Sequence, residues 1–157
     1  MIKVTKRLII ISLVAILVYS CKEKSNEETA APTAADVTTI GTTLTNFSNA
    51  LAIVDSTTLR KLASPNFVLL DEGKDYDYPL MIQQIKTIHN MGTMTRKPQM
   101  FRTVIHKDVA WSYYQVLVNF RTQQKSIDLN LLESAVLEKT KEGWVIVMMT
   151  TAPQTVK

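Results

Sequence analysis

Residues 130–153 read NLLESAVLEKTKEGWVIVMMTTAP, and this stretch decides the fold. It holds two apolar runs that flank the polar segment 139–143, whose last residue is Gly143. A glycine in that place suits the left-handed residue of a type I turn with a bulge. The stretch therefore predicts a β-hairpin whose strands cover residues 126–138 and 144–152.

The sequence before the hairpin predicts further strands. Residues 109–121 are rich in β-branched and aromatic side chains, and residues 100–106 alternate between apolar and polar. Short polar turns join these segments to each other and to the hairpin, which indicates four consecutive antiparallel strands. A shorter strand at 66–70 comes earlier and ends at the turn-forming sequence Asp-Glu-Gly of residues 71–73.

Helices are predicted only ahead of these four strands. Within residues 37–54 apolar side chains recur every three or four positions, which indicates a helix with Asp36 as its N-cap. Asp55 is the expected N-cap of a short second helix. Pro79 suits the first turn of a third helix, which should end near Gly92 as its C-cap.

The N-terminal segment indicates export. Basic residues in the first seven positions precede an apolar run at 8–18, which is too short to span a bilayer and is typical of a signal peptide. The run closes with Val18-Tyr19-Ser20-Cys21, which resembles the bacterial lipobox. That resemblance implies cleavage before Cys21 and acylation of this residue. A cleaved signal beside an incidental cysteine, or an uncleaved anchor, are the alternatives.

The chain then divides into an anchor, a tether and one domain. Residues 1–20 are the predicted lipoprotein signal peptide. Residues 21–35 carry no large apolar side chain and are predicted to form a lipidated, flexible tether. Residues 36–153 hold the folded domain, and residues 154–157 form a short tail. We therefore expect a protein anchored to the lipid bilayer of a bacterial cell envelope, on a periplasmic or outer-surface side.

The charge pattern argues against a nucleic-acid partner. The formal net charge is +4, but three of the basic residues precede position 8, and the others form no run. His89 and His106 are isolated in the sequence, and Cys21 is the only cysteine. The sequence therefore predicts no metal site, and without a glycine-rich phosphate loop no cofactor is expected.

The order of the predicted elements resembles the nuclear transport factor 2-like superfamily, which includes ketosteroid isomerases and polyketide cyclases. The resemblance implies an α+β fold in which a cone-shaped, curved antiparallel sheet wraps around the N-terminal helices and leaves a cavity at its open end. It places the chain among small secreted or lipid-anchored members. The matching residues run across the predicted domain: Asp55-x3-Leu59-x2-Leu62-Ala63, Asp71-Glu72-Gly73, Asp108-Val109-Ala110, and Glu133 to Leu137 through Gly143-Trp144.

Glu133 is the leading candidate for a functional residue. In the strand 126–138 the odd-numbered side chains are apolar except Glu133, so a carboxylate is expected on the buried face. Such a group can act as a general acid or base or bind a polar group of a ligand. Alternatively, it sits at the rim of the sheet or pairs with a structural partner such as Arg102. Asp71 and Tyr114 are further candidates, with turn capping and core packing as their structural alternatives.

Other residues are expected in or near the pocket. Trp144, Ile146, Met148 and Thr150 share one face of the last strand, and Ser112 belongs to the more apolar face of the strand before the hairpin. Thr150 stands where many relatives carry a histidine, which weakens any role taken from the resemblance for this position.

The leading functional hypothesis is an envelope lipoprotein whose domain binds a small, largely apolar ligand or forms a homodimer. No complete catalytic set is present, so this hypothesis is non-enzymatic. The aromatic residues Trp111, Tyr113 and Tyr114 could form a ligand wall or a dimer face. One alternative is an isomerase or cyclase-type enzyme in which Glu133 or Asp71 is the general base and Tyr114 stabilises an oxyanion. Another is a docking module for a second envelope protein.

Overall fold

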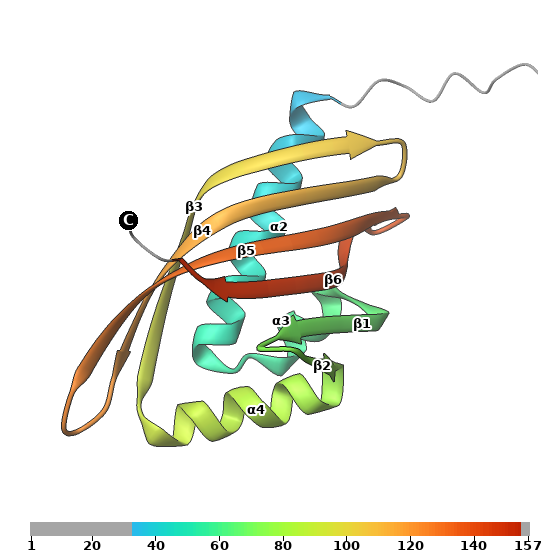
Figure 1. The fold of residues 1–157 in the computed structure, drawn as a ribbon. Coiled ribbons are helices and arrows are strands. Elements are labelled where there is room, and N and C mark those ends of the chain that lie inside the picture. The colour runs from blue at the N-terminus through green and yellow to red at the C-terminus, as the bar shows by residue number, and fades with distance from the viewer. Residues whose placement is uncertain (1–32, 155–157) are drawn as a thin grey trace, which may run out of the picture. The chain divides into compact units, whose positions relative to one another are not determined.

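The computed structural model describes residues 33–154, whose helices and strands are drawn in Figure 1. The predicted signal peptide, the lipidation site Cys21 and most of the tether fall on residues 1–32. Most of the predicted tail falls on residues 155–157. These predictions lie outside the described residues.

Three helices occur in the described part of the chain: α2 (Ala34–Ile53), α3 (Ser56–Leu62) and α4 (Tyr78–Met91). The first begins earlier than predicted, because its N-cap is Thr33 and not Asp36. The Thr33 side chain accepts a hydrogen bond from the backbone of Asp36, and the Asp36 side chain accepts one from the backbone of Thr33. This reciprocal capping box places Asp36 in the first turn, where a carboxylate also interacts favourably with the helix dipole.

The other two helices begin as their sequences predict. Asp55 caps α3 by accepting hydrogen bonds from the backbone of Thr57 and Thr58, both at 3.1 Å. Asp77 caps α4 by accepting from the backbone of Leu80 at 2.9 Å, with Pro79 in the first turn.

Gly92 ends α4 as predicted, but for a different physical reason. Its φ of 174° is extended backbone that any residue can adopt, so it is not a left-handed cap. A Cβ atom here would lie 2.1 Å from the carbonyl oxygen of Arg121. The close approach of two backbones therefore excludes a side chain at this position.

The sheet of residues 33–154 has six strands in the order β2-β1-β6-β5-β4-β3. Gly143 has a φ of 124°, which is the positive value predicted for the hairpin turn between the last two strands. The strands are β1 (Ala63–Asp71), β2 (Lys74–Asp77), β3 (Thr93–His106), β4 (Val109–Arg121), β5 (Ser126–Thr140) and β6 (Gly143–Pro153).

Three features of the sheet differ from the predictions. β2 was not predicted, and β3 begins at Thr93 instead of residue 100. The sheet is mixed and not wholly antiparallel, because β1 pairs with β6 in parallel. The pairs β3–β4, β4–β5 and β5–β6 are antiparallel, as expected.

The sheet is curved, and the long strands β3, β4 and β5 bend along their length (Figure 1). α2 packs against the concave face, so that Ile40, Leu44 and Phe47 join inward-facing side chains of β4 and β5 in one core. The even-numbered residues of β4 and the odd-numbered residues of β5 face this core, as their alternation predicts. The described part therefore has the α+β architecture expected from the sequence.

A bulge in β6 overturns the prediction of one continuous face for that strand. Leu137 pairs with Ile146 but Val136 pairs with Met148, so one extra residue of β6 lies between these pairs. Trp144 and Ile146 face inward before the bulge. After it the inward positions pass to Met149 and Thr151, the partners of the inward-facing Ala135 and Glu133. Met148 and Thr150 consequently turn to the other face.

Candidate functional site

A cavity of about 810 Å³ lies between the concave face of the sheet and the helices α2 and α4. Its walls are mainly apolar, which is usual for sites that bind small molecules. The apolar lining comes from both helices and from the sheet: Phe47, Leu51, Leu69, Met81, Ile85, Ile88, Met91, Met94, Val118, Phe120, Ile127, Leu129, Leu131, Met149 and Pro153.

Polar side chains cross the concave face in a single row. Asp71 of β1 pairs with Thr151 of β6, Thr151 pairs with Glu133 of β5, and Glu133 pairs with Tyr114 of β4. Residues that pair across strands project from the same face, so the register alone brings these four side chains together. The first three of them line the cavity. We refer to Asp71, Thr151, Glu133 and Tyr114 as the polar row.

Glu133 is buried in an ion pair. Its side chain accepts a hydrogen bond at Oε1 from Nη2 of Arg96, and the side chains are only 4% and 9% exposed, respectively. Nε of Arg96 donates to Oγ of Ser48 on α2 at 3.1 Å. The guanidinium group is thus fixed between the helix and the sheet, and it neutralises the carboxylate that the sequence placed on the buried face.

Arg96 and not Arg102 is the partner of Glu133, which corrects the predicted partner. Pairing of β3 with β4 shifts between Gln99 and Arg102, and Met100 at this bulge has a positive φ of 58°. Arg102 follows the bulge and is exposed. The segment that holds Arg96 was not recognised as a strand, because it is largely polar and contains a proline, and so this residue was missed.

Three oxygen atoms of the polar row are buried and have no hydrogen-bond partner among the described residues. They are Oε2 of Glu133, Oγ1 of Thr151 and the hydroxyl of Tyr114. Glu133 and Tyr114 are 3% and 1% exposed, respectively. Burial raises the pKa of Tyr114 well above its usual range, and the neighbouring Glu133 raises it further, so the phenol keeps its proton. A buried polar atom without a partner is costly, which makes this part of the site suited to a ligand that supplies one.

Asp71 lies at the other end of the polar row and is partly buried. Burial, followed by the negative charges of Glu72 and Glu133, raises its pKa. The group can therefore exchange a proton closer to neutral pH than an ordinary aspartate can. It lies about 14 Å from Tyr114 along the row, since three strand spacings of about 4.8 Å separate them.

The other predicted pocket residues do not line the cavity. Ser112 is buried in the core, where its hydroxyl lies 2.9 Å from that of Thr103. Trp144 and Ile146 are buried nearer the hairpin turn, and the bulge turns Met148 and Thr150 away from the cavity. Ser112, Trp144 and Ile146 are buried and Met148 and Thr150 are partly buried, all outside the lining of this cavity, so a functional role for them stays a prediction.

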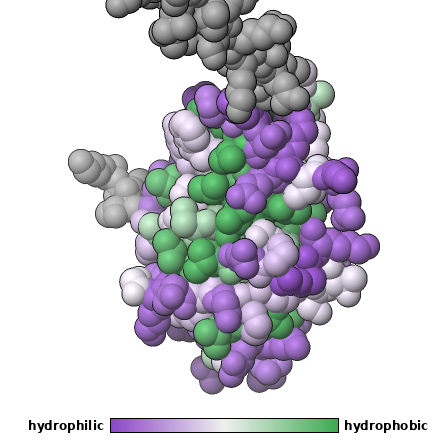
Figure 2. Space-filling view, turned by 90° about the vertical axis from the view of Figure 1, so that its right-hand side faces the viewer, coloured by the Kyte–Doolittle hydropathy of each residue, from purple (hydrophilic) through white to green (hydrophobic). Residues whose placement is uncertain are grey.

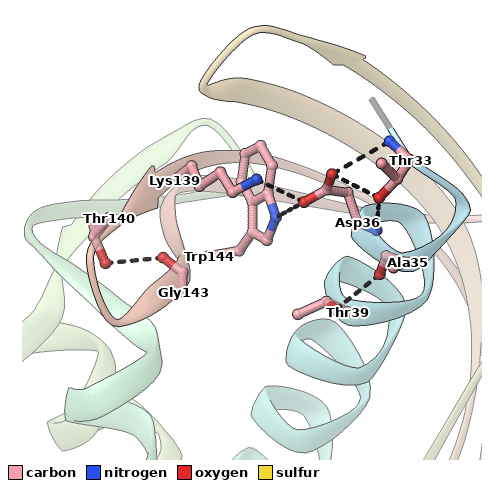
Figure 3. A network of polar contacts seen from close by, with 8 residues as sticks. All are labelled: Thr33, Ala35, Asp36, Thr39, Lys139, Thr140, Gly143 and Trp144. Carbon is pink, nitrogen blue, oxygen red and sulfur yellow. Dashed lines mark hydrogen bonds and ion pairs between the residues drawn. The ribbon is translucent and has the colours of Figure 1, made fainter. Parts of the chain in front are cut away.

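Trp144 instead belongs to a polar network that joins α2 to the last hairpin (Figure 3). Oδ1 of Asp36 accepts hydrogen bonds from Nζ of Lys139 at 2.8 Å and from Nε1 of Trp144 at 3.3 Å. The ammonium group of Lys139 also lies 5.6 Å from the centre of the indole ring. This network holds the start of the domain against the turn between β5 and β6.

Two further observations concern the described residues alone. Within 33–154, the His, Cys, Asp and Glu side chains form no group of three that could hold a metal ion. None of the helices in this part of the chain is long and apolar enough to cross a membrane.

The family of the chain follows from its sequence and fold together. The model of the SnoaL-like domain family matches residues 40–151, so the chain belongs to this family of the nuclear transport factor 2-like superfamily. No curated protein matches the chain. The fold and the resemblance inferred from the sequence are thereby confirmed.

Solved structures of similar fold include proteins of several descriptions. A candidate ketosteroid isomerase from Shewanella frigidimarina is 24% identical, with a TM-score of 0.60 over 71% of this chain and 93% of that one. A candidate dehydratase of the nuclear transport factor 2-like family from Streptomyces avermitilis is 14% identical, with a TM-score of 0.68 over 78% and 98%. A nuclear transport factor 2-like protein from Cytophaga hutchinsonii is 12% identical, with a TM-score of 0.66 over 78% and 100%. At these identities the likeness concerns the fold alone.

Proposed function

We propose that the protein is a membrane-anchored envelope lipoprotein whose SnoaL-like domain binds a small, largely apolar molecule. The observation that carries the proposal is the cavity of about 810 Å³, with apolar walls and a few convergent polar groups. Burial of apolar ligand surface against such walls contributes roughly 25 cal/mol per Å². The polar groups would then fix the orientation of the ligand.

The ion pair between Arg96 and Glu133 favours a role in ligand binding for Glu133 over a role as a general base. The carboxylate of Glu133 is held against the guanidinium of Arg96, so one of its two oxygens is already occupied and the group is fixed in place. Ser48 fixes the guanidinium in turn. Glu133 and Arg96 thus form a fixed polar part of the cavity wall.

One observation supports an isomerase or cyclase-type enzyme as a second candidate. Asp71 lines the cavity with a raised pKa, which suits a general base, and Tyr114 keeps the proton that an oxyanion would need. Their separation of about 14 Å along the polar row means that only a substrate that spans several strands could engage both. Binding without turnover therefore fits this geometry better.

The proposal also includes the anchor and a homodimer. Acylation of Cys21 would tether the domain to the bilayer through residues 21–35. Trp111 and Tyr113 are each 49% exposed, and they lie on the sheet face opposite the cavity, which offers apolar surface to a second copy or to another envelope protein. Figure 2 shows that hydrophobic residues also group on one side of the molecule, with hydrophilic residues around them.

Native mass spectrometry of the full chain, released from membranes in detergent, tests these parts together. We expect a lipid mass that is lost in Cys21→Ala, a dimer, and a non-covalently bound small molecule. Leu131→Trp fills the cavity and should remove the small molecule. Leu132→Trp adds the same side chain at a 43% exposed position on the other face and should retain it. A bound mass that is equal in both tryptophan variants would contradict ligand binding in the cavity.

A further inference from the structure

The charges around the cavity are strongly unbalanced. Among the described residues that line it, four are acidic and one is basic: Asp71, Glu72, Asp128, Glu133 and Arg96. The one guanidinium is already engaged with Glu133 and with Ser48. Of the remaining carboxylates, Asp71 is partly buried, whereas Glu72 and Asp128 are exposed and screened by solvent. The negative potential of the cavity is therefore strongest near Asp71.

The unpartnered polar atoms also favour one kind of ligand group. Oε2 of Glu133 belongs to a residue that is 3% exposed and lines the cavity, and it has no partner among the described residues. The side-chain oxygens of Asn130 and Gln154, which line the cavity as well, are likewise buried without a partner. Oγ1 of Thr151 also lines the cavity without a partner, and this hydroxyl can either donate or accept. The carboxylate and the two amide oxygens are acceptors only, so most of the unpartnered atoms call for donors on the ligand.

These two observations have independent origins but the same consequence. The excess of acidic side chains is a property of the cavity lining. The unpaired acceptors are buried oxygen atoms that no other group of the fold reaches. A carboxylate or phosphate on a ligand would be repelled by the acidic side chains. It would also provide no donor for the unpaired acceptors. A protonated amine would be attracted by the carboxylates and would supply up to three donors.

We propose that the cavity selects amphiphilic organic cations, in which an apolar body carries a protonated amine that binds at Asp71 and faces the unpartnered Oε2 of Glu133. This inference deepens the proposed function and rests on it. The apolar walls take the body, and the acidic end of the polar row takes the ammonium group. Neutral alcohols of the same shape should bind more weakly, and carboxylates should bind least.

Three compounds with one body and different head groups test the selectivity: 4-phenylbutylamine, 4-phenylbutanol and 4-phenylbutanoate. Each is titrated calorimetrically into the full chain in lipid nanodiscs, and titrations of empty nanodiscs are subtracted. We expect the amine to bind about ten-fold or more tightly than the carboxylate, since each head group interacts with fixed carboxylates at short range. The alcohol should fall between them.

Matched variants separate the local charge from the net charge. Asp71→Asn removes one carboxylate from the cavity and should weaken binding of the amine several-fold, with little change for the alcohol. Asp108→Asn removes the same charge from the turn between β3 and β4, outside the cavity lining, and should leave binding unchanged. An equal loss in both variants would overturn the inference.

The outcomes distinguish failure of the inference from failure of the proposed function. If the carboxylate binds as tightly as the amine, and Leu131→Trp abolishes both, the cavity binds ligands without the proposed selectivity. If none of the three binds, the inference is overturned. If binding is unchanged in Leu131→Trp, the ligand-binding function falls with it.

Discussion

Arg96 of β3 and Glu133 of β5 form an ion pair across the intervening strand β4, and both side chains are at least nine-tenths buried. The pair links the edge of the sheet to its centre, and Ser48 extends the link to α2. Its contribution to stability depends on both partners, because a buried charge that loses its counter-ion keeps the full cost of its desolvation.

Glu133→Gln should therefore destabilise the domain. The substitution leaves the guanidinium of Arg96 buried without its counter-ion, which lowers the free energy of unfolding by about 3–5 kcal/mol. Urea denaturation followed by tryptophan fluorescence measures the change. The double variant Arg96→Met/Glu133→Leu replaces the pair by apolar side chains and should recover at least half of the loss. A double variant less stable than Glu133→Gln would show that the charges are not coupled.

Gly92→Ala should also destabilise the domain, by overpacking. The new Cβ would lie 2.1 Å from the carbonyl oxygen of Arg121, so either the end of β4 or the start of β3 must move, at a cost of about 1–3 kcal/mol. Gly41→Ala is the matched control, because a Cβ in that part of α2 meets nothing within 4 Å. This control should stabilise the helix by about 0.5–1 kcal/mol in the same urea titration. The same sign for both substitutions would contradict the account of Gly92.

Much of the fold could be predicted because its signals are local. The stripe along α2, the caps of α3 and α4, and the turn at Gly143 each depend on residues within a few positions of one another. The alternation that placed Glu133 on the buried face of β5 is local in the same sense. The parallel pairing of β1 with β6 joins segments that are far apart in sequence, and no local pattern specifies it.

The face of β6 beyond its bulge could not be predicted for a specific reason. The strand contains the doublets Met148-Met149 and Thr150-Thr151, so a shift by one residue leaves the sequence of apolar and polar positions unchanged. Pairing with β5 decides the register, and it brings Thr151 to the polar row in place of Thr150. The alternation of apolar and polar residues in the sequence therefore does not distinguish Thr150 from Thr151.

Arg96 was missed because edge strands have weaker signals than central ones. β3 is paired on one side only, so it tolerates Pro98 and a polar composition that would be unfavourable in the middle of the sheet. The inward-facing alternation of Met94 and Arg96 is present, but it is short. The partner of a buried carboxylate is thus harder to find than the carboxylate.

Trp111→Lys tests the proposed homodimer. Trp111 is 49% exposed on the outer face of the sheet, and a charge there would be buried without a partner if two such faces met. We expect the dimer dissociation constant to rise about ten-fold or more, as measured by sedimentation velocity of the detergent-solubilised full chain. Ile53→Lys changes a 68% exposed apolar residue at the end of α2 and should leave the dimer intact. An unchanged dissociation constant for Trp111→Lys would exclude this face as the contact.

The network around Asp36 predicts how stability depends on pH. The hydrogen bond with Lys139, followed by those with Thr33, holds the pKa of Asp36 well below its ordinary value of 3.8. A carboxyl group whose pKa is lower in the folded than in the unfolded protein adds stability above the unfolded value. That stability is lost as the pH falls from about 4 toward the folded value. Asp36→Asn should therefore lower the melting temperature at pH 7, and the difference from the wild type should shrink between pH 4 and pH 2.

Thermal unfolding of both proteins by circular dichroism across this pH range measures the effect. Asp75→Asn is the control, because it removes an exposed carboxylate of β2 that forms no hydrogen bond or ion pair among the described residues. Its melting temperature should stay close to the wild-type value throughout. Asp36 is joined to Lys139 and Trp144 of the hairpin, so a constant difference between Asp36→Asn and the wild type down to pH 2 would mean that the residue acts through its shape and not through its charge. A shrinking difference would show that this carboxylate holds α2 against the strands that define the fold.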